Sequence, residues 1–144
     1  MRIRIYLYHH EFLLPTIGKI DTGWYRDIEP VHELPMGDAG ALSATLNLLV
    51  AAGNPIVVAP APGNRSKPYV VKRSGANSWR AFEREARAWS IIFEASSARL
   101  IPYRLADDGG FEEDTSAAEE FELAKGVDPI ARRIVSLAAQ CGPR

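Results

Sequence analysis

Hydrophobic and polar residues alternate in the first segment of the chain. In residues 2–8, Ile3, Ile5 and Leu7 take every second position, with Arg4 and Tyr6 between them. Successive side chains of a β-strand point to opposite faces, so this pattern predicts a strand with one buried face. Residues 17–33 mix glycine, proline and aromatic residues, which predicts one or two short strands around turns.

Three later segments show the spacing of helices. Leucines recur at helical spacing between Asp38, a good N-cap, and Gly53, a good terminating residue, which predicts a helix over 39–52. A short helix is predicted over 78–87, capped by Ser78. Its predicted buried face comprises Trp79, Phe82 and Ala86, and its outward face Arg80, Glu83, Arg84 and Arg87. A terminal helix is predicted from the Asp128-Pro129 pair onward, with Ile130, Ile134, Leu137, Ala138 and Cys141 along one stripe.

The remaining apolar runs are short and predict strands. Residues 56–59 lie between prolines and predict a buried strand, residues 60–68 predict a loop, and residues 69–72 predict another strand. Residues 89–93 and 100–105 have the spacing of a β-hairpin, in which Pro102 indicates a free edge on the second strand. This order of elements predicts an α+β fold, a single domain over 1–144 with a mainly antiparallel sheet and about three helices.

Composition adds few limits to this picture. The chain has 144 residues, 47% apolar content and a net charge of −1, which is ordinary for one globular domain. No apolar run is long enough for a membrane span, and the N-terminus does not read as a secretory signal, so we expect a cytoplasmic protein. Cys141 is the only cysteine and lies near the end of the chain, where we expect no thiol chemistry.

Charge is unevenly distributed along the chain. Between residues 107 and 122 the chain has no lysine or arginine and eight carboxylates: Asp107, Asp108, Glu112, Glu113, Asp114, Glu119, Glu120 and Glu122. Residues 65–104 instead hold nine lysines or arginines against three glutamates. An acidic run of this kind is either a solvated loop or an anionic surface that attracts a basic protein, such as a nuclease.

Few residues suggest catalysis or a cofactor. His9, His10, Glu11, His32 and Glu33 are the candidates for metal binding or acid–base chemistry, but their spacing fits no zinc pattern, so we expect no metal and no cofactor. The sequence also lacks a phosphate-binding glycine loop and a nucleophile elbow. A small enzyme that uses His10 or His32 is one alternative hypothesis.

Nucleic-acid binding is the second alternative. Basic and aromatic residues alternate through 65–104, namely Tyr69, Lys72, Arg73, Trp79, Arg80, Arg84, Arg87, Tyr103 and Arg104. Such residues can contact phosphates and stack on bases. The aromatic residues also fit a core-facing stripe, and the acidic run that follows would repel phosphate, so we expect no direct nucleic-acid binding.

Several short segments carry a resemblance to a known family. They are Trp24-Tyr25-Arg26, Asn54-Pro55-Ile56-Val57-Val58, Ser78-Trp79-Arg80-Ala81-Phe82-Glu83-Arg84, Trp89-Ser90-Ile91 and Pro102-Tyr103-Arg104. Together they resemble the small immunity proteins of bacterial contact-dependent growth inhibition systems. The resemblance implies an intracellular, non-catalytic protein that binds and neutralises a cognate toxin domain, often a nuclease.

The resemblance carries no residue roles, because each immunity protein binds its own toxin with its own surface. From the charge pattern we expect the carboxylates of 107–122 to meet a basic toxin surface. Phe111 within that run, and Trp24 and Tyr25 elsewhere, are candidate apolar anchors for the partner.

Overall fold

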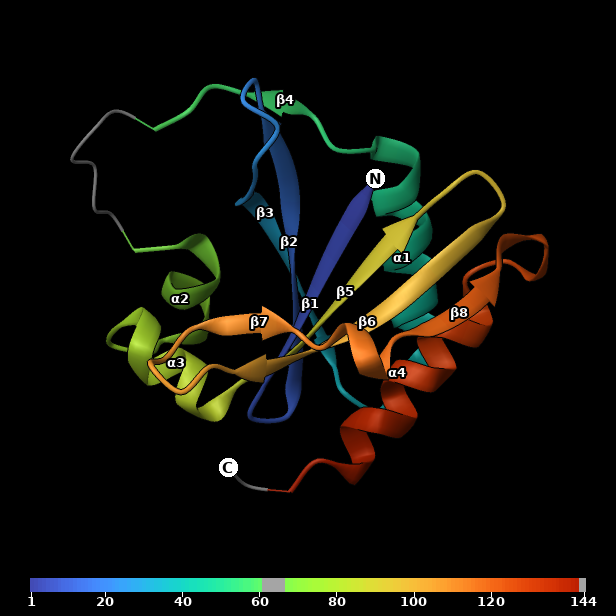
Figure 1. Ribbon diagram of the computed structural model, residues 1–144. Coiled ribbons are helices and arrows are strands. Elements are labelled where there is room, and N and C mark those ends of the chain that lie inside the picture. Colours follow the sequence, from blue (N-terminus) through green and yellow to red (C-terminus); the bar gives the residue numbers. More distant parts are fainter. Residues whose placement is uncertain (61–66, 143–144) are drawn as a thin grey trace.

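A computed structural model of the protein, which describes residues 1–60 and 67–142, contains one eight-stranded, mainly antiparallel sheet with helices on both faces (Figure 1). The strand order is β3-β2-β1-β5-β6-β7, with β4 beside β2 and β8 beside β6. The α+β prediction is therefore confirmed. The strands are β1 (Arg2–Tyr8), β2 (Glu11–Ile20), β3 (Tyr25–Pro35), β4 (Ile56–Val57), β5 (Arg87–Phe93), β6 (Ser97–Leu105), β7 (Phe111–Glu113) and β8 (Glu119–Glu122). The helices are α1 (Ala39–Ala52), α2 (Tyr69–Ser74), α3 (Trp79–Glu85) and α4 (Asp128–Gln140).

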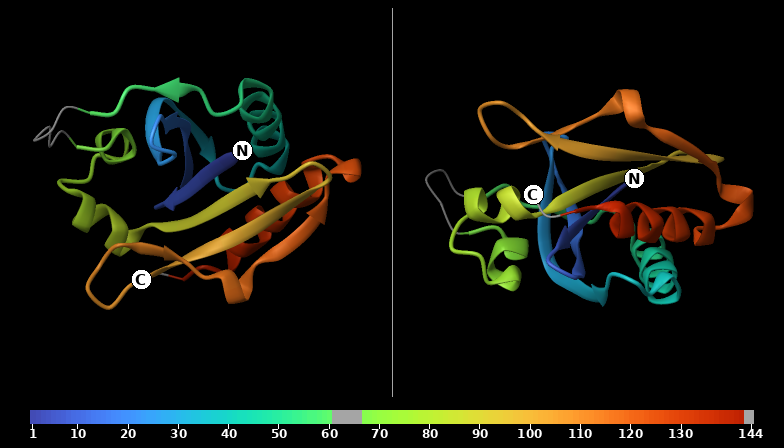
Figure 2. Two further views of the ribbon diagram at one scale, coloured as in Figure 1. Left: turned by 45° about the horizontal axis from the view of Figure 1, so that its top comes forward. Right: turned by 90° about the horizontal axis from the view of Figure 1, so that it is seen from below.

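The main core lies between one face of the sheet and two helices, α1 and α4. The alternating apolar residues of β1, including Ile3 and Ile5, join Trp89 and Ile91 of β5 in this core. The two helices lie side by side in the right-hand view of Figure 2. Ser43 of α1 donates a hydrogen bond to the carboxylate of Asp128 at the start of α4, which fixes the helices to each other.

The opposite face of the sheet is covered at one end by α2 and α3. Val70 and Val71 of α2 and Phe82 of α3 are fully buried there against Tyr6 and Leu13 of the sheet. Farther along β1 the same face carries the polar residues Arg2 and Arg4. This face therefore changes from an apolar core to a polar surface along a single strand.

Most predicted elements are found where they were expected. Asp38 accepts a hydrogen bond from the Ala41 amide at 2.9 Å and caps α1, and Ser78 accepts one from the Ala81 amide at 3.1 Å and caps α3. The hairpin of β5 and β6 and the terminal helix are confirmed, although Asp128 is the first helical residue and not the cap. The predicted strands within 17–33 are parts of β2 and β3, which are much longer. The predicted loop over 60–68 lies mostly outside the described residues.

One β prediction is wrong, and another is right about the strand, which is β4, but wrong about its burial. Residues 69–72 belong to helix α2, because a helix can turn both Val70 and Val71 toward the sheet whereas a strand would separate them. The run 56–59 is not buried: Ile56 is 83% and Val58 90% exposed. Only the side chain of Val57 turns inward, where a Cβ on Gly18 would lie 2.8 Å from it, so this crossing needs glycine.

Two side-chain expectations are also wrong. Glu83 does not point outward; it is 5% exposed and accepts a hydrogen bond from the Gly110 amide at 3.1 Å. Pro102 does not mark a free edge, because the Asp114 amide donates to its carbonyl at 2.8 Å and β7 and β8 both pair with β6. None of the helices in the described residues has the length and apolar content needed to cross a membrane.

Candidate functional site

The acidic segment forms an edge of the sheet. β7 pairs with the end of β6 and β8 with its beginning, so that Glu113 lies opposite Tyr103 and Glu119 opposite Leu100. The segment between them is a short 3-10 turn, Thr115–Ala117. In Figure 1 the whole segment follows the outer side of β6 in orange. Five of the eight carboxylates are therefore held on strands, and Asp107, Asp108 and Asp114 lie in the turns beside them.

Four of the eight carboxylates form ion pairs with basic residues from elsewhere in the chain. The pairs are Glu112 with Arg104 at 2.7 Å, Glu113 with Arg2, Glu119 with Arg133 at 2.9 Å and Glu122 with Lys125 at 3.7 Å. Asp114 accepts a hydrogen bond from Ser116 at 2.5 Å. The expectation of an uncompensated acidic strip is wrong for the four paired carboxylates, whose cations come from β1, β6 and α4 and, for Glu122, from Lys125 three residues on. The expectation of uniform exposure is wrong for Glu113, Asp114 and Glu119, which are half-buried.

A smaller anionic surface remains. Asp107 and Asp108 are exposed in the turn between β6 and β7, and Glu120 is exposed on β8; none of them forms an ion pair with another described residue. Glu112 and Glu122 are paired, but their side chains remain 49% and 75% exposed. We call the exposed set Asp107, Asp108, Glu112, Glu120 and Glu122 the acidic edge.

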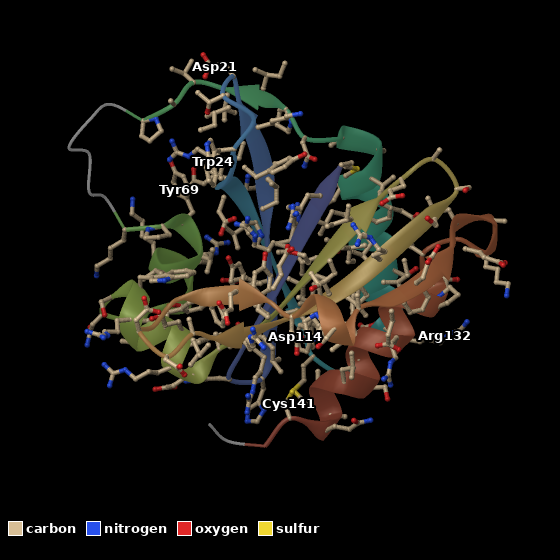
Figure 3. The ribbon with its side chains drawn as sticks, viewed as in Figure 1. Asp21, Trp24, Tyr69, Asp114, Arg132 and Cys141 are labelled. Atoms are coloured by element: carbon tan, nitrogen blue, oxygen red, sulfur yellow. The ribbon has the colours of Figure 1, made fainter. Side chains whose placement is uncertain are left out.

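The three predicted apolar anchors have different surroundings in the structure. Trp24 is 74% exposed at the tip of the β2–β3 hairpin (Figure 3). The Tyr25 ring lies under two cations, 5.6 Å from the Arg2 guanidinium carbon and 5.8 Å from the Lys19 ammonium. Phe111 does not project as an anchor, because it is partly buried among aromatic rings, 5.9 Å from those of Trp79 and Tyr103.

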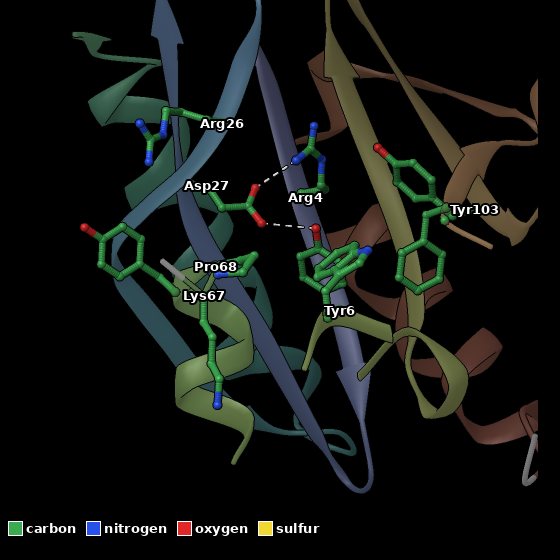
Figure 4. A pocket seen from close by; sticks show the side chains of 11 residues that line it. Arg4, Tyr6, Arg26, Asp27, Lys67, Pro68 and Tyr103 are labelled. Atoms are coloured by element: carbon green, nitrogen blue, oxygen red, sulfur yellow. Dashed lines mark hydrogen bonds and ion pairs between the residues drawn. The ribbon is translucent and has the colours of Figure 1, made fainter. Parts of the chain in front are cut away.

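A cavity of about 600 Å³ lies on the polar part of the sheet face (Figure 4). It is lined by Arg4, Tyr6, Arg26, Asp27, Lys67, Pro68, Tyr69, Trp79, Tyr103, Gly110 and Phe111. Aromatic rings from β1, α2, α3, β6 and β7 thus meet charged side chains from β1 and β3. Its size is typical of small-molecule sites.

An ion pair with a tyrosine forms the polar wall of this cavity. Arg4 Nη1 lies 2.8 Å from Asp27 Oδ1, and the Tyr6 hydroxyl donates to Asp27 Oδ2 at 3.1 Å. Burial raises the pKa of the Asp27 carboxyl, an effect that the Arg4 charge and the Tyr6 hydrogen bond only partly offset. Burial, together with the Asp27 charge, holds the pKa of Tyr6 well above its usual value. Burial by itself would lower the pKa of Arg4, but the charge of Asp27, the interactions with Tyr6 and Tyr103 and a hydrogen bond with Tyr103 together outweigh it, and the net shift is upward.

A second polar network lies beside the first, one step along β1. Arg2 pairs with Glu113 and donates to Ser90 Oγ at 3.1 Å, and Ser90 Oγ lies 2.6 Å from the Tyr103 hydroxyl. Burial would raise the pKa of Glu113, but the hydrogen bond and charge of Arg2 outweigh it and the pKa is lowered. Glu113 of β7 and the cavity are therefore connected through Tyr103 and β1.

Sequence reasoning missed Arg4 and Asp27 as site residues. The signal for Arg4 was present in the alternation of β1, where a charged side chain shares one face with tyrosines. Asp27 gave no such signal, because its place opposite Arg4 follows from the pairing of β3 with β2 around an irregularity between Pro15 and Thr16.

The structure does not bring the two candidate histidines together. His10 lines a second cavity of about 530 Å³ with His9, Glu85, Arg87 and Cys141, and His32 is not among its lining residues. His9 has a positive φ of 56° in the β1–β2 turn, and its Nε2 lies 2.6 Å from Glu85. The described residues contain no group of three or more histidine, cysteine or acidic side chains placed to hold a metal ion.

The fold is that of an α+β protein with one mainly antiparallel sheet. We compared the chain with known proteins. No protein-family model matches the chain, and no curated protein matches it. Among solved structures it is similar to a protein of unknown function from Neisseria meningitidis, with a TM-score of 0.67. The two are 13% identical over 98% of this chain and 94% of that chain, a likeness that shows the fold alone.

Proposed function

We propose that the chain is a non-catalytic, cytoplasmic immunity protein that binds and neutralises a cognate toxin domain, and that the acidic edge docks on a basic surface of that toxin. The observation that carries the proposal is the position of Asp107, Asp108 and Glu120 on the outermost strands and turn, where they are exposed and form no ion pair with another described residue. The sequence resemblance to immunity proteins of contact-dependent growth inhibition systems points to the same class.

The geometry supports docking at this edge in two ways. Asp107 and Asp108 lie in a hairpin turn closed by the Gly109 amide on the Ala106 carbonyl at 3.0 Å, so their carboxylates are presented on a fixed backbone. Fixed surface charges steer association with a partner of opposite charge, and a nuclease is basic where it holds phosphate. The ion-paired carboxylates are partly neutralised by their internal partners. We therefore expect the unpaired carboxylates to contribute most of the attraction to a basic toxin surface.

The test needs a candidate toxin domain, such as one encoded by a neighbouring gene, and a charge-reversed variant, D107K/D108K. We expect association with the toxin to slow by about tenfold at low salt and to become less dependent on salt, because rim charges act mainly on the association rate. Stopped-flow or surface-plasmon measurements at several salt concentrations would give both quantities. Glu113 is left unchanged because its reversal would set two cations against each other at Arg2.

The matched control is E11K/E29K, which reverses two exposed carboxylates on β2 and β3, away from the acidic edge. It makes the same change in net charge, so a response equal to that of D107K/D108K would mean that only total charge matters. Either that result or unchanged kinetics in D107K/D108K would remove the acidic edge from the interface. An absence of any complex with the toxin would overturn the proposed function itself.

A further inference from the structure

We infer that the cavity lined by Arg4, Asp27, Tyr69, Trp79 and Tyr103 is a binding site for one nucleotide, with the base against the aromatic rings and the phosphate toward the cations. The inference does not depend on the proposed function. It rests on three properties of the described residues: the ring surface in the cavity wall, the balance of charge around it and the incomplete pairing of Arg4.

The aromatic wall brings together three residues of the basic segment that the sequence spreads over 35 positions, namely Tyr69, Trp79 and Tyr103. Trp79 and Phe111 meet edge to face, at an interplanar angle of 82°, and Trp79 and Tyr69 are both partly exposed where they line the cavity. Stacking on such surfaces tolerates any base, because every base has a planar π-face.

The charge balance of the lining favours an anion. Arg4, Arg26 and Lys67 carry positive charge, and Asp27 is the one carboxylate among the lining residues. Asp27 is already engaged by Arg4 and by the Tyr6 hydroxyl. Arg26 and Lys67 stand at the rim with their head groups turned away from the centre (Figure 4), and long side chains of this kind can turn toward a phosphate.

Arg4 is not fully satisfied by its internal partners. Its Nη1 donates to Asp27, whereas its buried Nε has no hydrogen-bond partner among the described residues. Arginine recognises phosphate through several parallel N–H groups. A cavity of about 600 Å³ is also large enough for a base, a sugar and a phosphate together.

The test measures binding of the four ribonucleoside 5′-monophosphates by calorimetry and by tryptophan fluorescence in a W24F background, in which Trp79 at the cavity and the buried Trp89 remain. Adenosine and inorganic phosphate are the matched half-ligands. We expect at least one monophosphate to bind about tenfold or more tightly than either half-ligand, because the rings and the cations act on different parts of the same molecule. A short 5′-phosphorylated oligonucleotide serves as a second arm: tighter binding than the monophosphate assigns the site to a chain end, and weaker binding assigns it to a free nucleotide.

Variants locate the binding in the cavity. R26Q/K67Q removes two rim charges without touching the buried ion pair, and we expect it to weaken binding several-fold. R4M/D27N removes the ion pair as a unit and should abolish binding. The control, R84Q/R132Q, removes two exposed charges that do not line this cavity.

Three outcomes would overturn the inference. They are no saturable binding of any monophosphate, an affinity no better than that of phosphate or adenosine, and an equal loss in the control variant. Unfolding curves of each variant show that the fold is retained, so that R26Q/K67Q remains a fair test even where R4M/D27N is less stable.

Discussion

The cavity and strand β7 each hold a carboxylate that is paired with an arginine of β1, and the two carboxylates respond to their surroundings in opposite ways. Asp27, with a side chain 9% exposed, pairs with Arg4 and has a raised pKa; Glu113, 24% exposed, pairs with Arg2 and has a lowered pKa. In the first pair burial outweighs attraction, and in the second attraction outweighs burial. Both acids have an arginine as partner, and the more buried one has the raised pKa whereas the less buried one has the lowered pKa.

The same comparison shows where unbalanced charge resides. The acidic run is conspicuous in the sequence, yet half of its carboxylates are paired in the fold. No run of like charge in the sequence marks the cavity, yet Arg4, Arg26 and Lys67 line it together with a single acid, Asp27. Local charge density along a chain is therefore a poor guide to the charge that a partner meets.

The largest expected effect concerns the buried pair. Replacing Arg4 with methionine leaves the Asp27 carboxylate buried without its cation, and we expect a loss of about 3 kcal/mol in the free energy of unfolding. The double variant R4M/D27N should recover at least half of that loss, because no unpaired charge remains. Urea unfolding of both variants gives the two values, and a double variant as unstable as R4M would contradict the account.

The corresponding change at the pair of Arg2 and Glu113 should cost less. In R2M the Glu113 carboxylate keeps some contact with water and the hydroxyl of Tyr103, which lies 3.3 Å away. We expect a loss of about 1 kcal/mol by the same measurement. If R2M were as damaging as R4M, the difference in burial would not be what separates the two pairs.

The two acids should also give opposite pH dependence. The raised pKa of Asp27 means that its contribution to stability is present below about pH 4 and is lost as pH rises through the folded pKa. The lowered pKa of Glu113 means that its contribution is present above about pH 4.5 and is lost as pH falls through the folded pKa. Relative to D27N the wild type should therefore weaken with rising pH, and relative to E113Q it should weaken with falling pH. Unfolding curves at several pH values between about 3 and 7 measure both differences, and slopes of the same sign would refute this assignment.

The smallest effect is expected at the surface pair of Arg104 and Glu112. Their side chains are 63% and 49% exposed, so water and salt screen the attraction. Arg104→Gln should leave the thermal unfolding midpoint unchanged within error. A clear decrease would mean that the acidic edge depends on this pair for its structure.

Local signals in the sequence were sufficient for several elements of the fold. The caps Asp38 and Ser78, the period of β1 and the spacing of the β5–β6 hairpin each depend on neighbouring residues, and each is found in the structure. Helix α2 was missed because two adjacent valines favour a strand locally, whereas packing of both against the sheet requires a helix.

The site was harder to predict than the fold because it depends on long-range pairing. The exposure of Ile56 and Val58 follows from Val57 packing on Gly18, a contact that joins segments distant in sequence. The neutralisation of Glu113 and Glu119 likewise needs Arg2 and Arg133, which approach only when the sheet and α4 have formed. Trp24 and the exposed acids were identified from composition, but their roles in binding a partner stay predictions.

The position of β1 in the middle of the sheet bears on the order of assembly during translation. β1, β2 and β3 are consecutive and can pair as soon as they leave the ribosome, but the other edge of β1 pairs with β5, where Arg2 lies opposite Ile92. Until that later segment has been synthesised, the nascent chain presents an open strand edge that can recruit another chain. Stalled or truncated products that end before β5 should therefore be the aggregation-prone species of this protein, and the ones that most need a chaperone.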